Sequence, residues 1–123
     1  MSKVLQDLSL AGIVPVIAVQ DAGDAVGLCT ALRDGGLPVA EITFRTQAAQ
    51  EAIRQVHAHL PEVILGAGTV LTTQQVDQAV AAGASYIVSP GFNPRTVLHC
   101  QQLGIPIIAG CASPTELELA IEM

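Results

Sequence analysis

The clearest signal in the sequence is one order of features that recurs in RDGGLPVAEI (residues 33–42), AAGASYIV (residues 81–88) and QQLGIPII (residues 101–108). In each stretch the end of a helical segment is followed by glycine and then by a short apolar run. Glycine commonly closes helices, and short, almost continuously apolar runs are typical of parallel strands covered on both faces. The units recur about every 20 to 25 residues, which is the size of one βα unit. The sequence therefore predicts a parallel sheet built from repeated βα units.

Outward from these stretches, we expect a short N-terminal helix, then five strands, and a last helix from Ser113 onward. The segment between the second and third strands shows the helical period best, with apolar residues at i, i+3, i+4, i+7 and i+11 from Ala49 to Leu60. Two helix starts, at Thr72 with Gln75 and at Ser113 with Glu116, fit the capping box. The expected strands are residues 13–19, 38–44, 63–67, 85–89 and 106–109.

The composition indicates one globular domain, residues 1–123. Half of the residues are hydrophobic and 13% are charged, which suits a chain with a real core. Five Lys and Arg against eleven Asp and Glu give a net charge of −6, so we expect no binding to nucleic acid or to anionic membranes. No apolar run reaches the roughly 18 residues of a membrane span, and no secretory signal is visible. The three cysteines are odd in number and far apart, which indicates reduced thiols and a cytoplasmic location.

Two α/β architectures accommodate this order of elements. A doubly wound sheet of five strands is complete at this length. A (β/α)₈ barrel of the TIM type has eight strands and usually roughly 200 residues or more, so this chain would supply an N-terminal helix and about five βα units of an incomplete barrel. The local features favour the barrel and the length favours the open sheet, so the pattern leaves both possible.

Charged residues lie in an otherwise apolar expected strand. In PVAEITFRT (residues 38–46), Glu41, Thr43 and Arg45 alternate and should share one face. A carboxylate and a guanidinium there are costly unless they are paired or used in function. Four residues along a strand span about 13 Å, so a direct ion pair needs both side chains to lean together. Because function gathers at the carboxyl ends of parallel strands, Glu41 and Arg45 are the leading candidates.

The exits of the next two strands are rich in glycine, in GAGTV (residues 66–70) and SPG (residues 89–91). Glycine there lets a ligand approach the backbone closely. Thr69 is a candidate binding residue, with a plain loop hydroxyl as the alternative, and GAG alone is no dinucleotide fingerprint. His57 and His59 are two residues apart on an expected helix and cannot chelate together, so we expect no metal site.

Taken together, these motifs resemble the 2-keto-3-deoxy-6-phosphogluconate / 4-hydroxy-2-oxoglutarate aldolase family. The matching segments cover essentially the whole chain in the family's order, and EITFRT together with GAGTVL is the most specific part. The segments are VPVI (14–17), RDGG (33–36), VAEITFRT (39–46), GAGTVLTTQQV (66–76), AGASYIVSPG (82–91) and IPIIAGCASPTE (105–116).

The resemblance implies a class I aldolase of carbohydrate metabolism (Entner–Doudoroff), a cytoplasmic (β/α)₈ barrel that is usually a homotrimer and uses no metal or other cofactor. Such an enzyme splits a small 2-keto-4-hydroxy acid into pyruvate and an aldehyde through a lysine Schiff base. By position, Glu41 matches the general acid/base and Arg45 the group that binds the substrate carboxylate. Thr69 matches the pyruvate-contacting threonine, and Pro90 matches a proline that lines the pocket.

The sequence departs from the family in one respect: its single lysine is Lys3, in the leading segment. In the family, the imine-forming lysine lies on the sixth strand, and later strands carry the phosphate-binding residues. The five strands expected here include none of these, so phosphorylated and unphosphorylated substrates both stay possible. We expect the chain to be the front portion of a full enzyme. The alternatives are a truncated, non-catalytic half-barrel and an open sheet that binds a small carboxylate through Arg45 and Thr69. A phospho-receiver or flavodoxin-like module is a weaker third class, because only Glu41 supplies an acidic group at a strand end.

Overall fold

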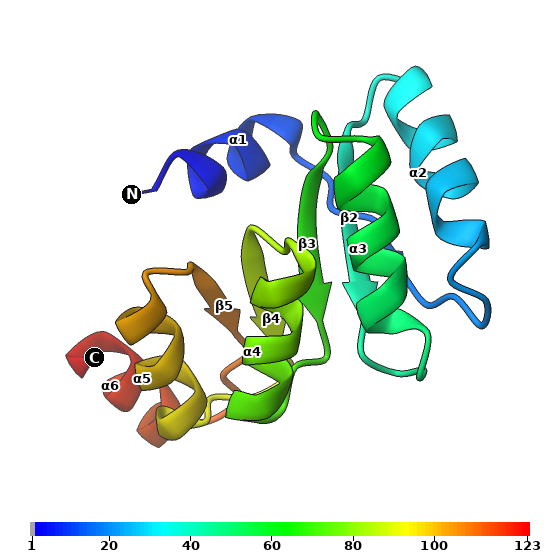
Figure 1. Cartoon of the computed structure of the whole chain (residues 1–123). Coiled ribbons are helices and arrows are strands. Elements are labelled where there is room, and N and C mark those ends of the chain that lie inside the picture. The colour runs from blue at the N-terminus through cyan, green and yellow to red at the C-terminus, as the bar shows by residue number, and fades with distance from the viewer. Residues whose placement is uncertain (1) are drawn as a thin grey trace.

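A computed structural model describes residues 2–123, in which helices and strands alternate along the chain (Figure 1). The strands are β1 (Val16–Ile17), β2 (Val39–Thr43), β3 (Ile64–Gly68), β4 (Tyr86–Ser89) and β5 (Ile107–Ala109). The helices are α1 (Lys3–Ala11), α2 (Asp24–Asp34), α3 (Ala49–His59), α4 (Thr73–Ala82), α5 (Pro94–Leu103) and α6 (Pro114–Glu122).

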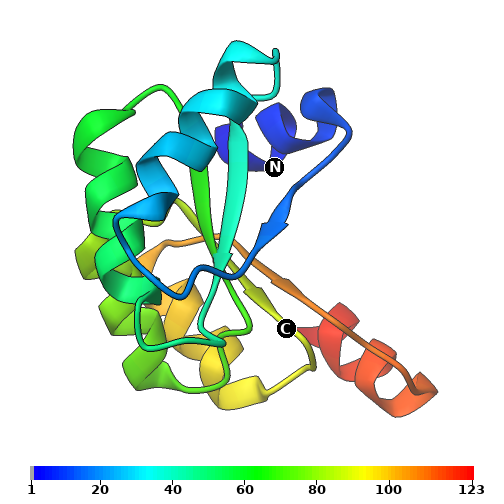
Figure 2. The same ribbon diagram turned by 90° about the vertical axis from the view of Figure 1, so that its right-hand side faces the viewer.

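The strand order distinguishes the two architectures that the sequence left open. The sheet in residues 2–123 has the order β1-β2-β3-β4-β5, and every neighbouring pair is parallel. A doubly wound sheet changes direction at a central switch point and has helices on both faces. Here the order never reverses, and α2 to α5 all cover one side of the sheet (Figure 2). The chain is therefore of the (β/α) barrel type and supplies an N-terminal helix and five βα units.

Each expected strand is present, and the largest error is at the first one. The apolar run at residues 13–19 predicted a long strand, but β1 contains Val16 and Ile17 alone. In residues 2–123, β1 lies at the edge of the sheet, and its ladder with β2 is limited to Val16 opposite Glu41 and Ile17 opposite Ile42. β3 is shifted by one residue from the expected 63–67 and ends at Gly68.

The two faces of the sheet have separate apolar cores. The outer core lies between the sheet and α2 to α5 and contains Ile42, Ile53 and Ile87. The inner core is smaller and joins Leu8 of α1 to Val39 and Tyr86 on the inner face. In Figure 1, α1 crosses the end of the sheet opposite to the arrowheads of β2 and β3. The carboxyl ends of the strands are therefore left uncovered by α1.

Both predicted helix caps form, one completely. Ser113 and Glu116 make a full capping box at the start of α6. At α4, Thr72 Oγ1 accepts from the Gln75 N–H, but the Gln75 side chain accepts from Leu71 N instead of returning to Thr72. The second capping box is thus half formed, because the Gln75 side chain bonds to the backbone of Leu71, one residue before Thr72.

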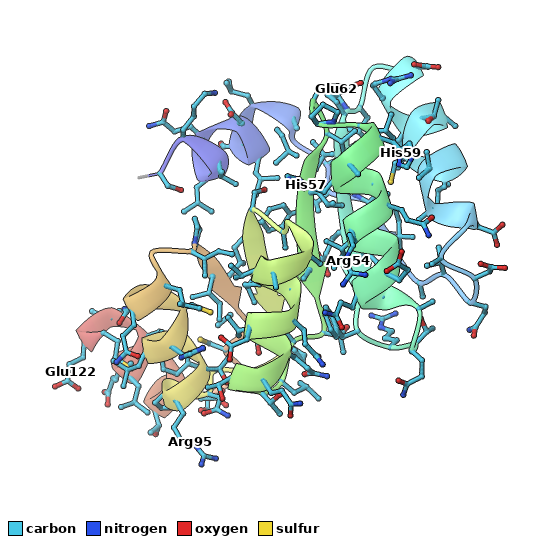
Figure 3. All side chains as sticks on the ribbon, in the orientation of Figure 1. Arg54, His57, His59, Glu62, Arg95 and Glu122 are labelled. Atoms are coloured by element: carbon cyan, nitrogen blue, oxygen red, sulfur yellow. The ribbon has the colours of Figure 1, made fainter. Side chains whose placement is uncertain are left out.

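The remaining sequence expectations concern residues away from the strand ends. His57 and His59 are exposed on α3, and Figure 3 shows them with Arg54 along this helix. Cys29 and Cys100 are buried, and burial raises the pKa of the Cys100 thiol to about 11. Within residues 2–123, every helix is too short or too polar to cross a bilayer.

Candidate active site

A pocket of about 220 Å³ opens near the carboxyl ends of β1 to β4. Its lining comes from four separate parts of the chain, which the parallel strands bring together at one edge of the sheet. The four residues selected from the sequence all lie on it. The lining residues are Val16, Glu41, Arg45, Thr69, Val88 and Pro90.

Glu41 is a carboxyl group buried within the sheet. It lies in the middle of β2, opposite Gly66 of β3, and is 7% exposed. Its side chain leans forward along the inner face, because a Cβ added to Gly68 would overlap Oε1 of Glu41. The carboxyl group therefore occupies the space that the missing side chain of Gly68 leaves, at the wall of the pocket.

The surroundings of Glu41 favour its protonated form. Burial raises the pKa of the Glu41 carboxyl, and the nearby Arg45 charge opposes that shift only in part. Among residues 2–123 Glu41 forms no ion pair, so the structure does not support the reading of Glu41 and Arg45 as a structural salt bridge. A carboxyl group whose pKa moves toward neutrality is suited to both giving and taking a proton.

Arg45 lies in a different position from the one that strict alternation predicted. β2 ends at Thr43, and Arg45 belongs to the turn that follows. Its Nε donates a hydrogen bond of 3.3 Å to Thr69 Oγ1, in the turn after β3. A backbone bond from Phe44 N to Gly68 O, 2.8 Å long, ties the same two turns together. Arg45 is thus held at the pocket by the neighbouring strand's turn, with its guanidinium exposed.

Thr43 is the one residue of the expected polar face that does not reach the pocket. Its hydroxyl donates to the backbone oxygen of Ile17, at 2.9 Å, and is buried. Thr43 therefore stabilises the pairing of β1 with β2, and its hydroxyl proton is already engaged with the backbone.

Arg45 also borders a second hollow of about 190 Å³ between the first turns of α3 and α4. Four amide side chains, of Gln47, Gln50, Gln75 and Gln78, line this hollow. It contains no titratable group besides Arg45 among the described residues, so it offers no proton-transfer chemistry. The pocket that holds Glu41 is the better candidate for an active site.

The sequence analysis missed Val16 and Val88 in the pocket and Tyr86 beneath it. Tyr86 and Val88 alternate on β4 and share the face that Pro90 continues. The period of two along residues 85–89 would have placed them there. No polar signal marks the two valines, because they contribute only an apolar wall.

Comparison with known sequences identifies the family. Residues 4–123 match the family model described as "Aldolase: KDPG and KHG aldolase". This chain belongs to the KDPG and KHG aldolase family. It is 49% identical over 122 residues to a 2-dehydro-3-deoxy-phosphogluconate aldolase of Treponema pallidum, an alignment that covers 99% of this chain and 58% of the relative.

Solved structures of KDPG aldolases have the same fold. The 2-keto-3-deoxy-6-phosphogluconate aldolase of Zymomonas mobilis ZM4, solved with 3-phosphoglycerate, superposes with a TM-score of 0.90 at 34% identity, over 98% of this chain and 57% of that one. The KDPG aldolase of Legionella pneumophila, with pyruvate captured at low pH as a covalent carbinolamine intermediate, gives 0.85 at 38% identity, over 89% and 53%. The chain therefore spans somewhat more than half the length of the aldolases that it matches.

Lys3 lies far from the Glu41 pocket in this aldolase-family chain. It is on α1, its side chain is 84% exposed, and its Nζ pairs with Asp7 at 2.6 Å. The α1 helix packs on the inner core at the end opposite to the pocket. Lys3 therefore cannot attack a substrate held near Glu41.

Proposed function

We propose that the Glu41 pocket is part of the active site of a class I aldolase that cleaves a 2-keto-4-hydroxy acid to pyruvate and an aldehyde. The substrates that we propose are 2-keto-3-deoxy-6-phosphogluconate and 4-hydroxy-2-oxoglutarate. The observation that carries the proposal is the meeting of Glu41, Arg45 and Thr69 in one pocket, in a chain of the aldolase family. Pro90 contributes an apolar wall to the same pocket.

Arg45 and Thr69 would bind the keto acid. A 2-keto acid presents a planar carboxylate, which a guanidinium grips with two parallel hydrogen bonds. The Nε of Arg45 is bonded to Thr69, which leaves the two terminal nitrogens of the guanidinium for the substrate. Thr69 would thus orient Arg45 as well as contact the pyruvate moiety.

Glu41 would move the protons of the reaction. A lysine amine adds to the C2 carbonyl, and loss of water gives a cationic imine. A base then removes the proton of the C4 hydroxyl, the C3–C4 bond breaks, and its electron pair passes to the imine to form an enamine. Protonation of C3 and hydrolysis release pyruvate. A buried carboxyl group with a raised pKa can serve as the acid for the loss of water that forms the imine and as the base for cleavage of the C3–C4 bond.

In this proposal a lysine other than Lys3 supplies the amine, because Lys3, the single lysine of the sequence, is held at α1. The Legionella pneumophila aldolase, in which pyruvate is captured as a covalent carbinolamine, supports the same covalent route here.

We also propose the homotrimer and the cytoplasmic location that the family resemblance implies. Light scattering on the purified protein tests the trimer.

Borohydride reduction in the presence of pyruvate tests the proposal. Reduction of the imine leaves a stable secondary amine on the lysine, which intact-mass and peptide mass spectrometry locate. We expect an adduct on a lysine other than Lys3, and K3R should leave it unchanged. An adduct on Lys3 would contradict the site assignment. Pyruvate that binds through Arg45 without any adduct would instead favour a non-covalent carboxylate-binding module.

A further inference from the structure

Tyr86 is a buried residue beside the pocket that the proposed mechanism does not use. Its side chain has no exposed surface, and it lies on β4 facing the inner side of the sheet. The phenol ring lies over Gly66, because a Cβ added to Gly66 would overlap three of the ring carbons. The hydroxyl donates to the backbone oxygen of Ala40, at 3.1 Å. One side chain thus reaches from β4 across β3 to β2.

The ring of Tyr86 fills the place beside Glu41. Glu41, Gly66 and Tyr86 are register partners on three adjacent strands, so their side chains project from one row of the sheet. Gly66 has no side chain, and the ring takes the space above it. Glu41 cannot fold sideways into that space, and its carboxyl group lies forward over Gly68 instead.

We propose that Tyr86 is a positioning residue for Glu41: its ring, seated on Gly66, keeps the Glu41 carboxyl group forward over Gly68 and at the pocket. The assignment of Glu41 as the proton-transfer group rests on the proposed function, but its placement by Tyr86 does not. The important part of Tyr86 is the ring, which supplies the volume, while the hydroxyl fixes the ring to the backbone of β2.

The charged and titratable groups that face Glu41 come from two elements. The turn after β2 contributes Arg45, and β4 contributes the Tyr86 phenol. β1 contributes Val16 and β3 contributes glycine, and neither carries a titratable side chain. Burial, and then the Glu41 charge, raise the pKa of Tyr86, so the phenol stays neutral at physiological pH. Tyr86 therefore acts on Glu41 through volume and exclusion of water, and not through charge.

An NMR titration of the Glu41 carboxyl carbon tests the placement in the intact protein, without any substrate. The chain is labelled with ¹³C-glutamate, and E41Q identifies the Glu41 signal. Y86F keeps the ring, so its Glu41 pKa should match the wild type. Y86L opens space over Gly66 for water and for the side chain, so its Glu41 pKa should fall toward that of an ordinary glutamate.

A folded Y86L variant with the wild-type Glu41 titration would overturn the proposal, as would a Y86F variant that titrates like Y86L. If Y86L does not fold, Y86M replaces it, because methionine has a similar length and no ring to fill the space over Gly66. The titration involves neither pyruvate nor the lysine. A failure of borohydride trapping would therefore reject the proposed function and leave the placement of Glu41 by Tyr86 standing. An unchanged Glu41 titration in Y86L would reject that placement and leave the proposed function standing.

Discussion

The Arg45 Nε donates a hydrogen bond of 3.3 Å to the hydroxyl of Thr69, and Thr69 has a backbone φ of +55°. β-Branched residues rarely adopt this left-handed conformation, which costs on the order of 1–3 kcal/mol. Within residues 2–123, Thr69 is the one non-glycine residue with a positive φ. The strained conformation turns the end of β3 so that the Thr69 hydroxyl meets the Arg45 guanidinium. We infer that the chain keeps this strain because it fixes Arg45 at the pocket.

Replacing Thr69 by glycine should stabilise the folded chain and lower its affinity for pyruvate. Glycine adopts a φ of +55° without strain, so we expect the free energy of unfolding to rise by about 1 kcal/mol. Arg45 loses its partner, so the Kd for pyruvate should rise several-fold. Urea denaturation and calorimetric titration measure the two effects. T69S keeps the hydroxyl and should keep the affinity; a T69G variant that is less stable than the wild type would show that Thr69 is not strained.

Arg45→Ala should weaken pyruvate binding without unfolding the protein. Arg45 is exposed and makes one side-chain hydrogen bond in the described chain, so its loss should change stability little. A charge-assisted hydrogen bond contributes about 1.5–3 kcal/mol, which predicts a Kd roughly 10- to 100-fold higher. R45K should recover only part of the affinity, because lysine lacks the planar fork.

The matched control for Arg45 is Arg54, an exposed arginine on α3 that pairs with Glu51 on the same helix (Figure 3). R54A removes the same charge from the chain but lies away from the pocket. We expect its pyruvate affinity to equal that of the wild type. Equal losses in R45A and R54A would indicate that only the net charge matters.

The sequence predicted the order of the elements and the candidate residues because both depend on local patterns. Glycine, apolar runs and capping residues mark each βα unit, and Glu41 is conspicuous as a charge in an apolar strand. Three features could not be predicted from the sequence, because they depend on contacts between strands. The extent of β1 depends on its register against β2, and Arg45 is held by a turn 24 residues away in the chain. The seating of Tyr86 over Gly66 needs the register of β3 against β4, which no local pattern contains.

Gly68→Ala should be destabilising out of proportion to its size. The new Cβ would overlap Oε1 and the carboxyl carbon Cδ of Glu41 and also its methylene carbon Cγ, so the whole side chain must shift. Overpacking of this kind costs about 1–3 kcal/mol. G91A is the matched control, because nothing lies within 4 Å of a Cβ at Gly91. Urea denaturation of both variants checks the prediction, and equal stability of the two would contradict the close seating of Glu41 on Gly68.

Glu41→Gln should stabilise the chain at neutral pH and not in acid. Burial raises the pKa of Glu41 in the folded state above its value in the unfolded chain. Between these two values the folded state holds a proton that the unfolded state has released, so stability falls as the pH rises, and the full cost applies above the folded pKa. Glutamine carries no charge to desolvate, which predicts a gain of about 0.5–2 kcal/mol at neutral pH. Below the unfolded pKa the Glu41 carboxyl group is protonated in both the folded and the unfolded state, so the gain should disappear.

Urea denaturation of wild type and E41Q at pH 7 and in acid measures this difference. E118Q, at an exposed position on α6, controls for the simple loss of one carboxylate. A gain for E41Q that is present at neutral pH and absent in acid would show that the folded chain bears the cost of a buried carboxylate. A gain of the same size at both pH values would attribute the effect to packing, and a loss at neutral pH would show that the Glu41 charge stabilises the fold. The expected result means that Glu41 is retained at the expense of stability, which is what a residue kept for proton transfer requires.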